Sequence, residues 1–247
     1  MKTFDITHIG KRSVNQDQVT IITKNDQQLI ALVCDGMGGH NSGELASKIV
    51  CDYIKECFRI MPFFQTLNEA KSWLEEVIVD AHLLTKKQAA TSPVHAGMGT
   101  TIVVALIYQR QILIANVGDS RCYYIGEKLV QLTDDDTFVN ELVKSGVISK
   151  DEARLHPKRH VLMKAIGVSD DLEVHAKHYP LKEGYLLLCS DGLYNTVEDD
   201  QIYSIVKGVG SLKEKGDTLV DTALNQGGTD NISIALIEIE GRDLNDQ

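Results

Sequence analysis

Proline and long hydrophobic runs are both scarce in this sequence of 247 residues. Only four prolines occur, and there is no low-complexity tract, Ser/Gly-rich linker or internal repeat, so we expect one domain over residues 1–241 and a short polar tail over 242–247. The longest apolar runs, such as 102–107, are far shorter than the roughly 20 residues that span a bilayer. The first residues have no apolar signal core. These absences predict a soluble, cytoplasmic protein with no membrane contact.

Paired cysteines and an excess of basic residues are also missing. The five cysteines form no CxxC motif and lie in apolar stretches, which is typical of buried, reduced thiols in the cytosol. The formal net charge is −10, whereas a nucleic-acid surface needs clustered Lys and Arg, so we expect no nucleic-acid partner. The excess acid is either a solvated face or a set of carboxylates that holds cations.

Strand-like segments dominate what is present. They are rich in Val, Ile and Tyr and are separated by short turns, which favours antiparallel hairpins. Helical spacing of apolar residues predicts two early helices and two late ones. Strands bracketed by helix pairs favour sheets packed face to face with helices outside. The expected strands are 4–9, 18–23, 29–34, 100–108, 111–117, 122–125, 129–132, 172–178, 185–189 and 232–239, and the expected helices are centred on 46–57, 70–81, 202–209 and 219–223.

Residues 134–165 form a polar, irregular stretch between the two groups of strands. We predict a small helical excursion from the strand scaffold here. Such an excursion is commonly a flap that contacts substrate. A plain surface loop is the alternative from composition alone.

Aspartates recur where the apolar strands begin or end. Asp35, Asp119 and Asp191 follow strands, Asp230 precedes one, and Asp17 precedes another. A single aspartate of this kind usually forms a turn. Five carboxylates that converge would repel each other, so a fold that gathers them normally holds a cation. The sequence offers no HxH, HExxH or paired cysteines, so Mg²⁺ or Mn²⁺ fits the oxygen donors better than Zn²⁺.

A glycine-rich turn and one arginine add to this acidic group. The Asp35 carboxylate can bridge two ions, and Gly36 lets the backbone carbonyl turn inward without a side-chain clash. Two ions roughly 3.5 to 4 Å apart suit hydrolysis of a phosphate ester. Arg12 lies close before Asp17, and a guanidinium can hold two phosphate oxygens. The alternative for Arg12 is an ordinary surface residue.

An ordered set of motifs runs from residue 12 to about residue 239: RSVNQD, VCDGMGGHNSGE, MGTT, NVGDSR, QLTDDD, HPKRHVL, AIG, LCSDGL and GTDNISI. Together they resemble the metal-dependent Ser/Thr phosphatases of the protein phosphatase 2C type, especially their compact bacterial branch. The resemblance implies an α/β sandwich of two antiparallel sheets flanked by helix pairs, with 134–165 as the flap. It also implies hydrolysis of phosphoserine and phosphothreonine by direct attack of a metal-bound hydroxide, without a phosphoenzyme.

The resemblance assigns catalytic and metal-binding roles to residues of these motifs. Asp35 would bridge two Mn²⁺ or Mg²⁺ ions, and Gly36 would supply a carbonyl oxygen. Asp191 and Asp230 would bind the metals directly, and Asp17 would hold metal-bound water. We therefore predict that Asp35, Asp191 and Asp230 are the catalytic residues of a two-metal site.

Further assignments concern the substrate and a third ion. Arg12 would bind the substrate phosphate, and Asp119, with Asp191, would form a weaker third-metal site. His40 is a candidate for substrate contact or protonation, and the alternative is a capping or surface residue. The family implies phosphoproteins and a cognate Ser/Thr kinase as partners in signalling. We expect the protein to be a monomer.

Four departures from the family pattern concern the same site. Met37 stands where some members have a histidine proposed as the leaving-group acid, so no side chain is assigned that role. Gln16 replaces the usual acid before Asp17, and Lys164 stands where Arg is frequent, which exchanges a bidentate contact for a point charge. The DHS expected in the flap reads Asp-Asp-Thr at 135–137, which alters its hinge.

Other functions lack their characteristic parts. The sequence has no GxxxxGK[ST] of an NTPase, no HRD or DFG of a kinase, and no Cys followed six residues later by Arg. Thr137 lies one position too early for DxDxT. A non-catalytic regulator with this fold would usually have lost metal ligands, which this chain keeps. A hydrolase of small phosphate esters stays open, because the metals and Arg12 contact only the phosphate.

Overall fold

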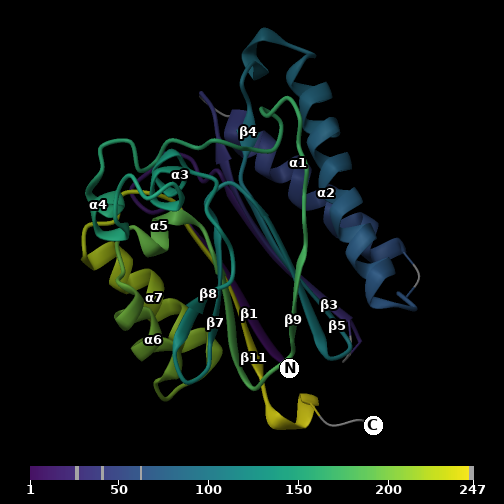
Figure 1. The fold of residues 1–247 in the computed structure, drawn as a ribbon, viewed down its shortest axis with the longest axis vertical. Coiled ribbons are helices and arrows are strands. Elements are labelled where there is room, and N and C mark those ends of the chain that lie inside the picture. Colours follow the sequence, from purple (N-terminus) through teal and green to yellow (C-terminus); the bar gives the residue numbers. More distant parts are fainter. Residues whose placement is uncertain (26–27, 40–41, 62, 245–247) are drawn as a thin grey trace.

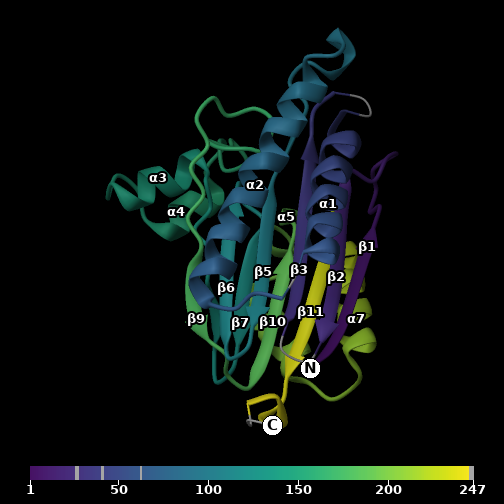
Figure 2. The same cartoon turned by 90° about the vertical axis from the view of Figure 1, so that its right-hand side faces the viewer.

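The computed structural model describes residues 1–25, 28–39, 42–61 and 63–244. Two antiparallel sheets lie face to face, with one pair of helices outside each (Figures 1 and 2). The first sheet has the order β1-β11-β10-β7-β8 and the second β2-β3-β5-β6-β9, with β4 paired to the end of β3. The strands are β1 (Lys2–His8), β2 (Asp17–Asn25), β3 (Gln28–Met37), β4 (Gly99–Thr100), β5 (Ile102–Tyr108), β6 (Gln111–Val117), β7 (Arg121–Ile125), β8 (Leu129–Gln131), β9 (Lys177–Pro180), β10 (Gly184–Cys189) and β11 (Ile232–Ile239).

The helices cover the outer faces of the sandwich. Helices α1 and α2 pack on the second sheet, and α6 and α7 pack on the first (Figure 1). Two short helices, α3 and α4, lie in the 134–165 segment beside one end of the strands. The bounds are α1 (Ser42–Ile60), α2 (Leu67–Ala89), η1 (Pro93–His95), α3 (Phe138–Lys144), α4 (Lys150–Leu155), α5 (Asp191–Tyr194), α6 (Asp199–Lys207), α7 (Leu212–Asn225) and η2 (Gly241–Leu244).

The middle strands are apolar throughout because both of their faces are covered. On β3, Leu29, Ala31 and Val33 face the first sheet, whereas Ile30 and Leu32 face α1 and α2. A strand covered on both sides reads as a continuous hydrophobic run. This layered burial confirms the predicted sandwich of two antiparallel sheets. The five cysteines are free thiols, and all but the half-buried Cys57 are buried.

One predicted strand is displaced. The sequence predicts a strand over 172–178, but β9 is Lys177–Pro180. Leu172, Val174 and Ala176 pack against the α1–α2 layer as irregular chain. The Ala176 amide donates to the Glu75 carboxylate on α2, at 2.9 Å, instead of to a neighbouring strand. These apolar residues therefore bury one face of the segment without forming strand hydrogen bonds.

The flap contains helices, as its pattern predicts. Thr137 caps α3 by accepting a hydrogen bond from the Asn140 amide at 3.2 Å, and Ser149 and Glu152 form a reciprocal capping box on α4. These side chains satisfy amides that a short helix leaves without partners. Across the described part of the chain, no helix is long and apolar enough to cross a membrane.

Candidate active site

A polar pocket lies where strands of both sheets meet the flap. Its volume is about 290 Å³. Asp35, Asp119, Asp191 and Asp230 line it together with Arg12. Asp17 lies just behind, because the β2–β3 register sets it directly opposite Asp35. The sequence-predicted carboxylates thus converge although up to 213 positions separate Asp17 from Asp230.

Asp17 is the most deeply buried of these carboxylates, with 1% of its surface exposed. Its Oδ2 accepts a hydrogen bond from the Ser190 hydroxyl at 2.7 Å. Its Oδ1 is buried and accepts no hydrogen bond from the described residues. Burial, and next the charges of Asp191 and Asp230, raise the pKa of Asp17 to about 7. The hydroxyls of Ser190 and Ser233 lower this pKa only in part, so the described protein compensates an ionised carboxylate at this position incompletely.

The neighbouring aspartates share this electrostatic problem. Burial raises the pKa of Asp119 to about 8 and that of Asp191 to about 6, with further increases from adjacent carboxylates. The pKa of Asp35 is raised well above its ordinary value by the same two causes. Like charges gathered away from water disfavour the ionised forms. A bound cation is the usual means of relieving such repulsion.

The Asp35–Gly36 turn is held closely by its surroundings. The Asp35 carbonyl accepts hydrogen bonds from the Thr101 amide and the Thr100 hydroxyl, each at 2.8 Å. A Cβ added at Gly36 would lie 2.2 Å from the carbonyl oxygen of Gly43 on α1. Glycine is thus required at residue 36 because helix α1 approaches the strand closely. This packing reason adds to the predicted role of its carbonyl.

Arg12 reaches the same pocket from the loop after β1. Its Nη2 lies 2.8 Å from Oδ2 of Asp230, and 57% of the arginine side chain is exposed. The guanidinium therefore faces the acidic group with part of its surface open. This placement favours the predicted phosphate contact over the alternative of an ordinary surface arginine.

Two lining residues of the flap were missed by sequence reasoning. His160 of the flap lies with Nδ1 3.9 Å from Oδ2 of Asp191, and Leu162 lines the pocket beside it. Both belong to HPKRHVL, so the motif was visible, although it carried no assigned role. Met37 lines the pocket as well, whereas His40 lies outside the described residues.

The altered flap hinge makes specific contacts with the Asp119 turn. The Asp135 carboxylate pairs with Arg121, at 2.7 Å between Oδ2 and Nη2. The Arg121 guanidinium stacks 3.6 Å above the Tyr194 ring, and the Tyr194 hydroxyl donates to the Asp119 carbonyl at 2.8 Å. Asp136, in the position of the usual histidine, accepts a hydrogen bond from the Gly118 amide at 3.1 Å. The first flap residues are therefore tied to the turn that carries Asp119.

The donor set suits hard cations. Among the residues described, no group of three His, Cys, Asp or Glu side chains forms a ready-made cage for one ion. Mg²⁺ rarely needs such a cage, because it usually keeps several waters and takes one or two carboxylates. Carboxylates with raised pKa values, and the Asp17 oxygen without a donor, fit ions bound partly through water.

Comparisons with known proteins agree with this arrangement. The family model "Protein phosphatase 2C" matches residues 6–227. The serine/threonine phosphatase stp of Listeria innocua is 37% identical over 229 residues, which cover 92% of this chain and 91% of that protein. The protein phosphatase PhpP of Streptococcus pneumoniae is 36% identical over 245 residues, covering 96% and 97%.

Solved structures show the same likeness. The serine/threonine phosphatase Stp1 from Staphylococcus aureus matches with a TM-score of 0.92 and 36% identity, over 97% of this chain and 95% of that one. The catalytic domain of the serine/threonine protein phosphatase PstP, in complex with two manganese ions, matches with a TM-score of 0.84 and 28% identity, over 97% and 98%.

Proposed function

This chain belongs to the protein phosphatase 2C family and is a serine/threonine phosphatase, and on that premise we propose that it hydrolyses phosphoserine and phosphothreonine with two Mn²⁺ or Mg²⁺ ions. The observation that carries this proposal is the convergence of buried aspartates with raised pKa values beside one half-exposed guanidinium. The manganese ions of the PstP complex support the choice of metal.

We assign the metal-binding atoms to the residues that line the pocket and the one behind it. Asp35 and the Gly36 carbonyl, with Asp191 and Asp230, would hold the two ions, and Asp17 would order water through its free oxygen. When bound, such ions lower the pKa of a water for attack on phosphorus and neutralise the charge that develops on the phosphate. Crowded carboxylates become favourable in that state, which explains why the fold tolerates their repulsion.

Asp119 is the proposed ligand of a third, weaker ion. It is 7% exposed, and the charge of Asp191 helps to raise its pKa. Both carboxylates line the same pocket, and in this proposal they share the third ion. Asp119 also sits on the turn that the flap contacts through Asp136 and Tyr194.

Arg12 positions the phosphate in this proposal. Its present partner, Asp230, is itself a proposed metal ligand. A cation at Asp230 removes much of the attraction that holds the guanidinium there. Arg12 is then available to donate two hydrogen bonds to phosphate oxygens, a geometry that a guanidinium satisfies and an ammonium does not.

Release of inorganic phosphate tests the proposal. A phosphothreonine peptide and p-nitrophenyl phosphate are each incubated with EDTA, Mg²⁺ or Mn²⁺. We expect metal-dependent release from both substrates. Release from p-nitrophenyl phosphate alone would favour a hydrolase of small esters. Absence of release with every metal, given folded protein, would favour a non-catalytic regulator. Phosphoproteins and a cognate Ser/Thr kinase are the proposed partners.

A further inference from the structure

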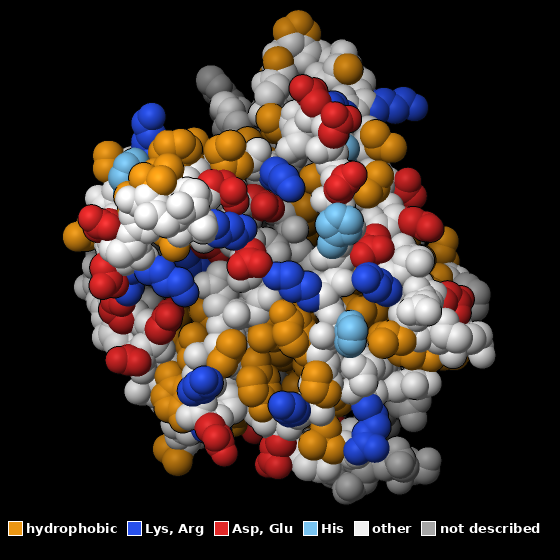
Figure 3. All heavy atoms as spheres, viewed as in Figure 1, with side chains coloured by type: hydrophobic (Ala, Val, Ile, Leu, Met, Phe, Trp, Pro, Cys, Tyr) orange, Lys and Arg blue, Asp and Glu red, His pale blue; other side chains and the backbone are white. Residues whose placement is uncertain are grey.

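A second and larger pocket opens at the other end of the sandwich. It has a volume of about 1000 Å³ and lies between the outer strands β8 and β9, reaching β10, β11 and α6. Figure 3 shows apolar side chains exposed along this cleft, with basic side chains beside them. Four of the chain's eight tyrosines line it. We call it the tyrosine groove, and these residues are Tyr124, Tyr179, Tyr185 and Tyr203.

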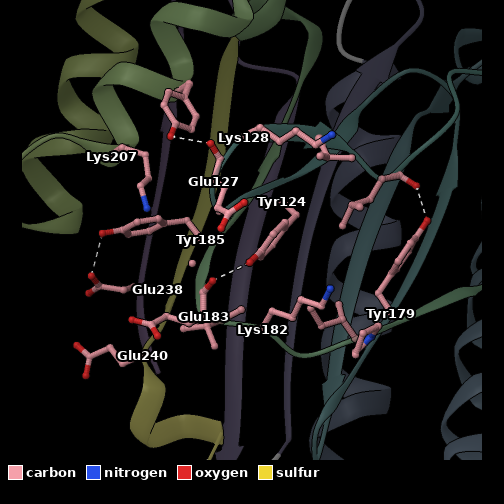
Figure 4. Close-up of a pocket in the computed structure, with 18 residues that line it drawn as sticks. Tyr124, Glu127, Lys128, Tyr179, Lys182, Glu183, Tyr185, Lys207, Glu238 and Glu240 are labelled. Carbon is pink, nitrogen blue, oxygen red and sulfur yellow. Dashed lines mark hydrogen bonds between the residues drawn. The ribbon is translucent and has the colours of Figure 1, made fainter.

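The tyrosine rings are held in fixed positions (Figure 4). Each hydroxyl donates a hydrogen bond to another part of the protein, so none needs a ligand to satisfy it. Rings fixed in this way present apolar faces at low entropic cost to a binding partner. Tyr124 donates to the Glu183 carbonyl at 2.6 Å and Tyr179 to the Leu132 carbonyl at 3.1 Å. Tyr185 donates to the Glu238 carboxylate and Tyr203 to the Glu127 carbonyl, each at 3.0 Å.

Two glycines keep the floor of the groove open. A Cβ at Gly126 would lie 2.7 Å from the Tyr124 hydroxyl oxygen, and a Cβ at Gly184 would lie 2.7 Å from the Ile125 carbonyl oxygen. Gly184 also has a φ of +145°, which L side chains rarely adopt. Tyr124 can therefore lie flat along the backbone only because both positions lack a side chain.

Lysines surround the groove without acidic partners. Within the described part of the chain, Lys128, Lys182 and Lys207 form no ion pair, although all three line the groove. Figure 4 shows them on different sides of the tyrosine rings. Lys207 has its Nζ 5.9 Å from the centre of the Tyr185 ring. Three lysines without a described ion pair stand out in a chain whose formal net charge is −10.

Two of the four acidic side chains that line the groove form ion pairs with a lysine. Lys2 pairs with both Glu238, at 3.1 Å from its Nζ, and Glu240. A second cation, Lys215, donates to the Tyr185 hydroxyl that itself donates to Glu238, so two cations face these two carboxylates. Glu127 and Glu183 are the lining carboxylates for which the described residues provide no ion pair. Among the lining groups without an ion pair in the described part of the chain, three lysines therefore outnumber two glutamates, although the net charge of the whole chain is negative.

We propose that the tyrosine groove binds an extended segment of a partner protein, with an apolar side chain between the tyrosine rings and acidic residues at the three lysines. The flanking strands favour an extended ligand, because β8 and β9 stand at the edges of their sheets as far as the chain is described. Edge strands offer amide and carbonyl groups to such a segment.

The groove is well separated from the candidate active site. Strand β10 runs from Gly184 in the groove to Cys189, just before Asp191. Six residues at about 3.3 Å each give a separation of roughly 20 Å. A segment bound in the groove leaves the catalytic pocket free. It would also raise the local concentration of a phosphorylated partner. Binding at the groove does not require catalysis, so the inference stands apart from the proposed function.

Fluorescence anisotropy tests the groove without any turnover. The probe is a fluorescein-labelled peptide with a central leucine run flanked by aspartates, and its twin carries lysines in place of the aspartates. We expect the acidic peptide to bind at least tenfold more tightly than the twin. The double variant Lys128→Glu with Lys182→Glu should weaken binding of the acidic peptide about tenfold. Tyr179→Ala should also weaken it, and thermal melts establish that each variant is folded.

Lys87→Glu is the matched control, because this exposed lysine lies on α2, outside the groove. It should leave peptide binding unchanged. Equal binding of the two peptides, equal loss in the control, or no binding of either peptide would overturn the proposal. Sedimentation velocity tests whether a second copy of this chain occupies the groove. A self-association that the double lysine variant abolishes would identify a second copy as the ligand and also overturn it.

Discussion

Replacing Asp17 by asparagine should stabilise the metal-free protein at pH 8. The pKa of Asp17 is raised from 3.8 to about 7 in the folded state, so the folded protein binds this proton more tightly than the unfolded chain does. Stability linked to Asp17 is therefore fully present below pH 4 and is lost as the pH rises toward 7. About three pH units at about 1.4 kcal/mol each place the loss near 4 kcal/mol.

Asparagine avoids this loss but introduces a smaller one. Its carbonyl can still accept from the Ser190 hydroxyl, whereas its amide nitrogen takes the place of the oxygen that has no described donor. An unsatisfied buried amide costs about 1–2 kcal/mol. The expected net gain at pH 8 is about 2 kcal/mol, or roughly 4–8 °C in melting temperature for a chain of this size. At pH 5 the stability that Asp17 loses by ionisation and the cost of the asparagine amide nearly cancel.

Thermal unfolding with EDTA at pH 5 and pH 8 measures both values. Asp171→Asn is the control, because Asp171 is exposed and no ion pair is described for it, and it should shift neither melt. Added Mn²⁺ should raise the melting temperature of the wild type much more than that of the variant. An Asp17→Asn protein no more stable than wild type at pH 8 would refute the view that repulsion and burial strain this site.

Four other outcomes follow from the same contacts. Asp191→Ala should lower phosphate release by more than about 10²-fold while far-UV circular dichroism stays native; near-normal turnover would exclude Asp191 as a ligand. Arg12→Ala should raise KM for p-nitrophenyl phosphate about tenfold with a smaller change in kcat, and unchanged constants would return Arg12 to an ordinary surface role. EDTA should abolish activity and Mn²⁺ restore it, as phosphate release reports. Arg121→Met leaves the partly buried Asp135 with only the Gln131 amide as a side-chain donor among the described residues and should cost about 2 kcal/mol in urea unfolding; the double variant with Asp135→Leu should lose less.

Local patterns were sufficient for most of the fold. The apolar run 29–34 is a strand because both faces of β3 are covered, and its composition carries that information. The strand predicted over 172–178 is displaced because its apolar residues show only that one face of the segment is buried. Whether the backbone forms strand hydrogen bonds depends on a partner strand. Here the partner of Ala176 is the Glu75 carboxylate on another element. That contact is non-local, and no pattern within residues 172–178 encodes it.

The candidate site likewise has a part that the sequence predicts and a part that only the fold reveals. The motifs identified the aspartates, since each sits beside a strand end, and the sandwich then brings those ends together. His160 lines the pocket only because the flap returns toward Asp191. The contacts of Asp135 and Asp136 with the Asp119 turn depend equally on that return. Spacing along the chain does not specify where an irregular segment crosses a pocket.

The tyrosine groove shows why a second site is harder to recognise than a first. Its four tyrosines come from β7, β9, β10 and α6, and each is an unremarked member of an apolar segment. No motif joins them, because the groove uses ring faces and backbone carbonyls that many residues could supply. Catalysis demands particular atoms at particular places, so its residues leave recognisable motifs. Docking demands only shape and charge, and those become visible when the folded surface is known.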